Sequence, residues 1–96
     1  MSYMIKSWAD KESKRLFDGK RSKVPTQIQE RALSKLQTLN ATSSLETLGK
    51  VPGNRLESLM GDRAGQHSIR INAQYRVCFR WENGDAYEVE VADYHV

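Results

Sequence analysis

Residues Tyr75–Trp81, YRVCFRW, alternate between aromatic or apolar side chains and polar or small ones. The apolar face carries Val77 and Phe79 between its two aromatic ends, and the opposite face carries Arg76, Cys78 and Arg80. A period of two is typical of a β-strand with one buried face. The stretch therefore predicts a strand with one side in a hydrophobic core and two arginines on the other side.

The same period continues on both sides of this strand. Further strands are predicted over Arg55–Leu59, Gln66–Ile71 and Ala86–Asp93, after a turn at Pro52-Gly53-Asn54. The connections between them are short, so consecutive strands are expected to pair as an antiparallel meander.

Residues before Pro52 follow a helical period instead. Pro25 suits the first turn of a helix, and apolar residues then recur on one helical face, at Ile28, Ala32, Leu36 and Leu39. We predict a helix over Pro25–Leu39 that packs on the sheet.

Three shorter elements complete the expected secondary structure. Asp10 is a candidate N-cap for a helix that continues to Asp18 and ends at Gly19. Met4–Trp8 is predicted as a short strand, and Ser44–Leu48 as a brief helical turn.

Helices followed by antiparallel strands predict an α+β fold of two layers, with a helical hairpin on the sheet. The length of 96 residues suits one domain, over residues 1–96. Met4 could equally begin the chain, so residues 1–3 are interpreted as an extension.

Composition excludes several classes of protein. Hydrophobic residues make up 39% of the chain and charged residues 28%, as in a globular domain and unlike a disordered chain. The sequence contains no apolar run suited to a membrane span and no secretory signal, so we expect a cytoplasmic protein. The single cysteine, Cys78, is interpreted as a packing residue, and with His67 and His95 it lacks zinc-site spacing. Neither a metal nor another cofactor is expected.

The net charge of +3 is unevenly distributed. Residues 1–35 hold nine Lys and Arg against four Asp and Glu, which gives +5, and the remainder holds six against eight, which gives −2. Such residues often only solvate helix faces, but a cationic half also attracts phosphate in a salt-dependent way.

Loop length decides which residues of the last two strands face each other. A two-residue turn at Asn83-Gly84 would bring Glu88 opposite Phe79 and so place carboxylates on the apolar face. We therefore predict a three-residue loop, Asn83–Asp85. This loop pairs Trp81 with Tyr87, Phe79 with Val89, Val77 with Val91 and Arg80 with Glu88.

The preceding loop, Asn72–Gln74, sets Arg70 beside Arg76, which is unfavourable unless an anion lies between them. Arg76 is also expected opposite Ala92, with Glu90 on the same face. Two interpretations stay open. Either Glu90 neutralises Arg76 in a surface ion pair, or this face binds phosphate with Arg76 as a bidentate donor.

Three titratable residues, Asp93, Tyr94 and His95, lie together near the end of the sequence. Histidine titrates near neutral pH, tyrosine exchanges a proton when an arginine lowers its pKa, and aspartate orients histidine. Beside Arg76, this group could cleave RNA without a metal ion. A base would take the 2′-hydroxyl proton, the arginine would stabilise the pentacoordinate phosphate, and an acid would protonate the 5′-oxygen. A terminal segment is, however, more often frayed than catalytic.

A family resemblance rests on segments spread over almost the whole chain: Met4–Ser7, Asn54–Gly65, Ser68–Arg70, Tyr75–Phe79, Asn83–Ala86 and Asp93–His95. In this combination the chain resembles the HigB-type, or proteic killer, branch of the RelE toxin superfamily. The resemblance implies a type II toxin: a ribosome-dependent endoribonuclease that cuts mRNA codons in the A site of the 70S ribosome and so inhibits translation. It also implies a helical hairpin on a curved antiparallel β-sheet. The implied partner is a helix-turn-helix antitoxin, HigA-like, through which alone the toxin would reach operator DNA.

Carried over position by position, the resemblance implies the catalytic residues Arg76, Asp93, Tyr94 and His95. Where some members have a catalytic histidine this chain has Glu57, and where a lysine would follow it has Met60. Either Glu57 replaces the histidine as a base, if its pKa is raised, or the C-terminal residues transfer the proton.

The resemblance also gives the basic residues a role in binding RNA and the ribosome. The candidates are Lys11, Lys14, Arg15, Lys20, Arg21, Lys23, Arg55, Arg63 and Arg70. Two other hypotheses remain. One is a basic module that binds RNA or the ribosome and blocks translation without cleavage. The other is a metal-dependent nuclease, which is disfavoured because no Asp and Glu cluster accompanies the arginines.

Overall fold

The computed structural model describes residues 4–93, so residues 1–3 and 94–96, which include Tyr94 and His95, lie outside the described part. The described elements are α1 (Lys11–Phe17), α2 (Thr26–Ala41), α3 (Leu45–Gly49), η1 (Pro52–Asn54), β1 (Glu57–Ser58), η2 (Gly61–Arg63), β2 (His67–Arg70), β3 (Tyr75–Glu82) and β4 (Asp85–Asp93), where η denotes a 3₁₀ helix. The predicted α+β fold is confirmed.

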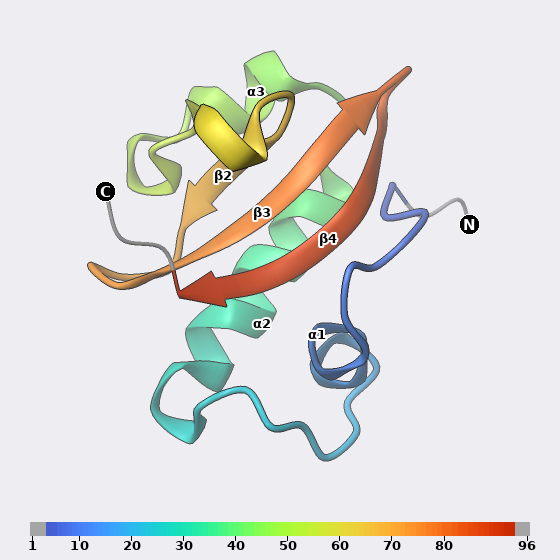
Figure 1. The fold of residues 1–96 in the computed structure, drawn as a ribbon, viewed down its shortest axis with the longest axis vertical. Helices are drawn as coiled ribbons and strands as arrows, with labels where there is room; N and C mark the ends of the chain where they lie inside the picture. The colour runs from blue at the N-terminus through green and yellow to red at the C-terminus, as the bar shows by residue number, and fades with distance from the viewer. Residues whose placement is uncertain (1–3, 94–96) are drawn as a thin grey trace.

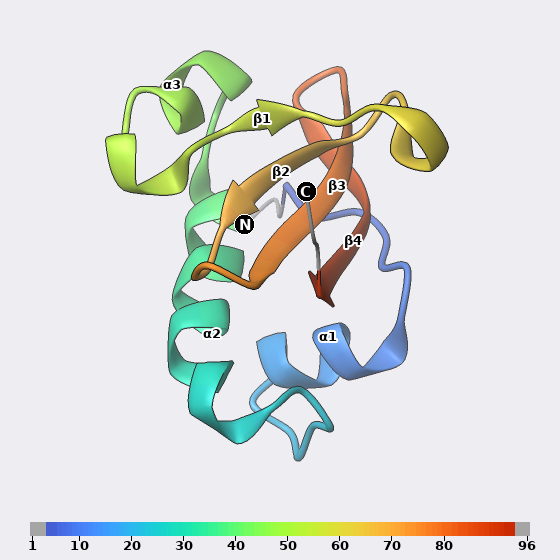
Figure 2. The same ribbon diagram turned by 60° about the vertical axis from the view of Figure 1, so that its left-hand side comes forward.

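The strands form one antiparallel sheet in the order β1-β2-β3-β4, which is the predicted meander. Figure 1 shows α2 passing behind the curved strands β3 and β4, and Figure 2 shows α1 crossing the direction of α2. Both helices contribute to the core on one face of the sheet. The opposite face, called here the outer face, carries Arg76, Cys78 and Arg80 of β3.

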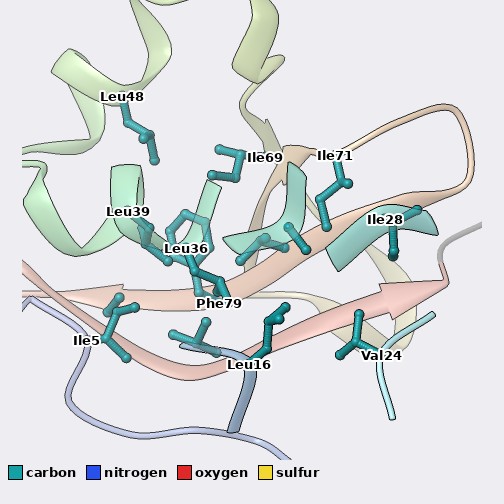
Figure 3. Close-up of a cluster of buried hydrophobic side chains, with 14 residues drawn as sticks. Ile5, Leu16, Val24, Ile28, Leu36, Leu39, Leu48, Ile69, Ile71 and Phe79 are labelled. Carbon is teal, nitrogen blue, oxygen red and sulfur yellow. The ribbon is translucent and has the colours of Figure 1, made fainter. Parts of the chain in front are cut away.

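The core is built on α2 and β3. All four residues of the predicted helical stripe are buried, and Figure 3 shows Leu36 and Leu39 beside the side chain of Phe79. Burying an aliphatic or aromatic side chain of this size is worth about 1.5–3 kcal/mol. The core therefore holds the outer-face residues of β3 on a rigid support.

The N-terminal segment lies beside β4 (Figure 1). Ile5 forms an isolated parallel bridge with Ala86, and Trp8 forms one with Val89. The N–H group that follows each of them donates to the carbonyl of the same partner, at 2.8 and 2.9 Å. The predicted strand over Met4–Trp8 is therefore wrong as a regular strand, although the segment covers the free edge of β4.

The helical elements begin and end close to the predicted residues. Asp10 is the N-cap of α1 by position but makes no side-chain cap hydrogen bond, and Gly19 follows the helix with φ +77°. The expected turn after Thr42 is α3, whose N-cap Ser44 accepts a hydrogen bond from the Thr47 N–H at 3.0 Å. No helix within residues 4–93 has both the length and the apolar character needed to cross a membrane.

The connection between β3 and β4 differs from the prediction. Asn83 and Gly84 form a two-residue turn between paired Glu82 and Asp85, and both turn residues have positive φ, 50° and 85°. This geometry matches the twist of a hairpin. The predicted three-residue loop is wrong, and so is the pair Trp81 with Tyr87, because Trp81 pairs with Ala86.

A bulge in β4 corrects the register that this turn creates. Between the pairs Arg80↔Tyr87 and Cys78↔Glu90, β4 has one more residue than β3, and Glu88 has φ +53°. Beyond the bulge Val77 pairs with Val91, as predicted. The extra residue thus keeps the apolar residues on the core face, but it lies within the strand and not in the loop.

Candidate active site

The outer face combines a small apolar cluster with charged side chains. Leu59, Cys78 and Ala92 pack together there. Burial raises the pKa of the Cys78 thiol, so the group stays protonated near neutral pH, and its prediction as a packing residue is confirmed. This cluster lies on the same face of the sheet as Arg76 and Arg80.

Arg76 is the most deeply held of these arginines, with 8% of the residue exposed. Its Nε donates to Ser68 Oγ at 2.6 Å, and its Nη2 donates to the backbone carbonyl of Arg55 at 2.6 Å. Arg55 has a left-handed backbone, φ 43°, as it leaves η1. A buried guanidinium needs such partners because desolvation of an unpaired charge is costly. The contacts fix the direction of the side chain.

Glu57 brings a carboxylate to Arg76. Strand β1 pairs Glu57 with Ser68, and Glu57 Oε2 lies 3.9 Å from Arg76 Nη2. The Glu57 side chain is 52% exposed, so it reaches water while the guanidinium beneath it is largely covered. The arrangement offers a proton acceptor and an anion-binding group within reach of one phosphodiester.

The two predicted arginine neighbours are indeed opposite each other. Arg70 pairs with Arg76 across β2 and β3, and Arg76 pairs with Ala92 across β3 and β4. Two guanidinium groups on facing positions repel each other, so this end of the sheet favours an anion.

Glu90 does not neutralise Arg76. Its Oε1 lies 2.6 Å from Arg63 Nη2, and its backbone pairs with Cys78. The interpretation of an Arg76–Glu90 surface pair is therefore wrong. Arg80 Nε lies 2.5 Å from Glu88 Oε2, so these two side chains form an ion pair. The predicted strand pair of Arg80 with Glu88 is wrong, because Arg80 pairs with Tyr87.

The third described candidate, Asp93, lies at the end of β4 opposite Tyr75 and accepts a hydrogen bond from Gln74 Nε2 at 3.0 Å. It is the residue from which the chain continues to Tyr94 and His95. Asp93 directly follows Ala92, the residue opposite Arg76, but by its pairing with Tyr75 it lies on the other face of the sheet from Arg76.

The remaining basic candidates form a different surface. Lys11, Lys14, Arg15, Lys20, Arg21 and Lys23 are all exposed on α1 and the loop after it, and Lys14 pairs with Asp18 at 2.8 Å. Because α1 packs on the core face, these six residues do not join Arg76 in one cluster. Within residues 4–93, no three His, Cys, Asp or Glu side chains gather as a metal site requires.

Comparison with known proteins gives the family. The model of the HigB-like toxins, described as RelE-like toxins of type II toxin–antitoxin systems, matches residues 6–95. The chain belongs to the HigB-like toxin family. Membership of this family gives the chain an antitoxin partner, since a type II toxin is one half of a toxin–antitoxin pair.

Two relatives of this HigB-like chain extend the match. A Proteus vulgaris protein named Endoribonuclease HigB is 39% identical over 93 residues, which cover 96% of this chain and 100% of the relative. A Vibrio cholerae protein named Toxin HigB-1 is 41% identical over 70 residues, which cover 72% of this chain and 74% of the relative.

Sequence reasoning missed the groups that hold Arg76. Ser68 follows the same alternation as Arg70 and so shares the outer face, which is a signal that register alone could have supplied. The backbone carbonyl of Arg55 left no such signal, because its direction depends on the left-handed backbone after η1.

Proposed function

We propose that this HigB-like toxin is an endoribonuclease that cleaves mRNA codons in the ribosomal A site without a metal ion and so inhibits translation. The observation that carries the proposal is Arg76, buried in the outer face, held by Ser68 and Arg55, and 3.9 Å from the exposed carboxylate of Glu57. The Proteus vulgaris relative, named an endoribonuclease, supports the same activity.

The proposed reaction needs a base, an acid and a cation at one phosphodiester. A base removes the proton of the 2′-hydroxyl, the 2′-oxygen attacks phosphorus, and the 5′-oxygen leaves with a proton from an acid. Arg76 donates to the phosphate oxygens as negative charge builds on the pentacoordinate phosphorus. The products are a 2′,3′-cyclic phosphate and a 5′-hydroxyl.

Glu57 is the base of this proposal, and Tyr94 or His95 supplies the acid with Asp93 as the orienting group. Glu57 replaces the histidine of other members, and Met60, 83% exposed, stands where a lysine would follow. The site therefore has one cation fewer near Met60 than members with the lysine, and Arg76 neutralises more of the phosphate charge.

Dependence on the ribosome fits the scarcity of free aromatic rings in the described chain. Trp8 packs against Phe17 with ring centroids 5.4 Å apart, and Trp81 packs against Phe79 at 6.3 Å. Recognition of single-stranded RNA commonly uses aromatic stacking of the bases. Since these tryptophans serve the core, ribosomal RNA is the proposed source of stacking surfaces, and the exposed cations of α1 are proposed to contact its phosphates.

The proposed setting is the cytoplasm, with a helix-turn-helix antitoxin as the partner. Operator DNA would be contacted through the antitoxin alone.

The test is a reconstituted translation reaction with a defined mRNA, with and without 70S ribosomes, read by primer extension. Wild-type protein is expected to cut only when ribosomes translate the mRNA, and Arg76→Ala is expected to cut nowhere. Lys6→Ala, at an exposed lysine of the N-terminal segment, is the matched control and should cut like wild type.

The chemistry of the new ends separates this proposal from its rivals. A 5′-hydroxyl that polynucleotide kinase phosphorylates directly supports attack by the 2′-oxygen, whereas 5′-phosphate ends would point to hydrolysis by a metal-activated water. Uncut mRNA with stalled ribosomes would instead favour the non-cleaving module.

A further inference from the structure

A groove of about 530 Å³ lies at the edge of the sheet, between α2, η1 and the turn after β2. Its lining includes four cationic residues, Arg31 and Lys35 from α2, Arg55 after η1, and Arg70 at the end of β2. The other lining residues are small, polar or apolar, and none is acidic. The groove is therefore cationic on three of the elements that form it.

These four cations have no carboxylate partner among residues 4–93, where every ion pair involves other residues. Arg63 and Arg80, by contrast, each have a glutamate on the outer face. Several unneutralised like charges around one concave space raise its positive potential and repel one another. An anion in the groove removes that repulsion.

Lys35 is fixed in the groove by a buried amide. Its Nζ donates to Asn54 Oδ1 at 2.7 Å. Asn54 is only 1% exposed, and its Nδ2 donates to the carbonyl of Leu48 at 3.0 Å. The ammonium group is thus held in place before any ligand arrives, which lowers the entropic cost of binding.

The groove is connected to Arg76 by two residues. Arg55 lines the groove, and its backbone carbonyl accepts the hydrogen bond from Arg76. Arg70 lines the groove and faces Arg76 across β2 and β3. An RNA strand with one phosphate at Arg76 therefore has a cationic path that leads over the sheet edge into the groove.

We propose that this groove binds a backbone phosphate of RNA next to the phosphate at Arg76, and that Arg31 and Lys35 are ligands of this phosphate. This inference rests on the proposed function for the RNA at Arg76. Arginine forks bind phosphate oxygens in pairs, and the lysine adds a point charge. Ser34 and Asn72 also line the groove and supply neutral hydrogen-bonding groups.

The test compares two double variants of the full chain that remove the same charge. Arg31→Ala with Lys35→Ala removes two of the four cations of the groove. Lys6→Ala with Lys50→Ala removes two exposed lysines elsewhere. The probe is a fluorescent single-stranded RNA with 2′-O-methyl groups, which cannot be cut by 2′-oxygen attack. Its affinity is measured by anisotropy over a series of salt concentrations, and a second arm measures binding to 70S ribosomes with an empty A site.

The groove variant is expected to weaken binding about tenfold and to reduce the slope of log affinity against log salt by about one, while the control keeps the wild-type slope. A loss with free RNA assigns the phosphate to mRNA, and a loss with ribosomes alone assigns it to ribosomal RNA. Equal behaviour of the two double variants in both arms overturns the inference. So does unchanged RNA binding with weakened antitoxin binding, which would assign the groove to an acidic protein surface.

Failure of this inference is distinct from failure of the proposed function. The binding assay needs no cleavage, so a groove that binds RNA in a protein that never cuts mRNA would preserve the inference and refute the activity. Arg31→Ala alone, at an exposed position of α2, repeats the test if the double variant unfolds.

Discussion

Glu90 forms its ion pair with Arg63, 2.6 Å between Oε1 and Nη2, although Glu90 and Arg76 share the outer face of the sheet. Arg76 is held instead by a hydroxyl and a backbone carbonyl, which are neutral. Its positive charge is therefore only weakly compensated, by the half-exposed Glu57 at 3.9 Å. A guanidinium in this state is rigid and still attractive to phosphate, which is what stabilisation of a transition state requires.

Ser68 acts as a positioning residue for Arg76. Ser68→Ala is expected to slow cleavage about tenfold, because a hydrogen bond to a charged group is worth about 1.5–3 kcal/mol. Ser68→Thr keeps the hydroxyl and should recover most of the rate. Ser58→Ala, on the neighbouring strand, is the control. Equal rates for Ser68→Ala and Ser58→Ala in the translation assay, with equal melting temperatures, would contradict this role.

Glu57 can be tested by a change that keeps its shape. Glu57→Gln is expected to lower the cleavage rate by about 100-fold, since general-base catalysis contributes about 10²–10⁴. Its effect on the free energy of unfolding should stay within about 0.5 kcal/mol because the side chain is half exposed. Single-turnover cleavage and urea unfolding measure the two effects. A full rate in Glu57→Gln would assign the base to residues beyond Asp93.

The turn between β3 and β4 gives a prediction for stability. Gly84 has φ +85°, so Gly84→Ala should destabilise the fold by about 1–2 kcal/mol although a methyl group there meets nothing within 4 Å. Gly53 is equally open but has no positive φ, and Gly53→Ala should be neutral or stabilising by up to about 1 kcal/mol. Urea unfolding of both variants checks the contrast, and equal effects would contradict the backbone argument.

Cys78 predicts a pH dependence. Burial raises the pKa of its thiol in the folded state, so the unfolded chain loses this proton first as pH rises. The contribution to stability is complete below the ordinary thiol pKa, about 8.5, and declines above it. Cys78→Ala should flatten this part of the stability profile between neutral and alkaline pH. The native thiol should also react with Ellman's reagent only on unfolding, and fast labelling of the folded protein would contradict its burial.

Periodicity was sufficient for most of the fold. The stripe on α2, the alternation in β3 and the order of the strands follow from local patterns that agree with the final packing. The pair Arg70↔Arg76 also followed from loop length, because three residues were enough to close that turn without a bulge.

Other features could not be predicted, because local sequence patterns fit more than one arrangement equally well. At the last hairpin the apolar pattern required one extra residue, and the loop and the strand were both able to accommodate it. Asn83-Gly84 favours the tight turn strongly enough that the irregularity moved to Glu88, whose N–H is satisfied by Ser7 Oγ at 2.9 Å. For the site, the missing knowledge was which carboxylate reaches which arginine, a question of side-chain direction. The groove arises from α2 and η1 together, which no local pattern connects.

The bridges of Ile5 and Trp8 to β4 join the first described residues to the last strand. All other strand pairs form between neighbours in the chain and can be made in the order of synthesis. The N-terminal segment, in contrast, cannot form its bridges until Ala86 and Val89 have been synthesised. A growing chain therefore leaves this edge unmade, and the outer face with Arg76 is completed only when β4 emerges.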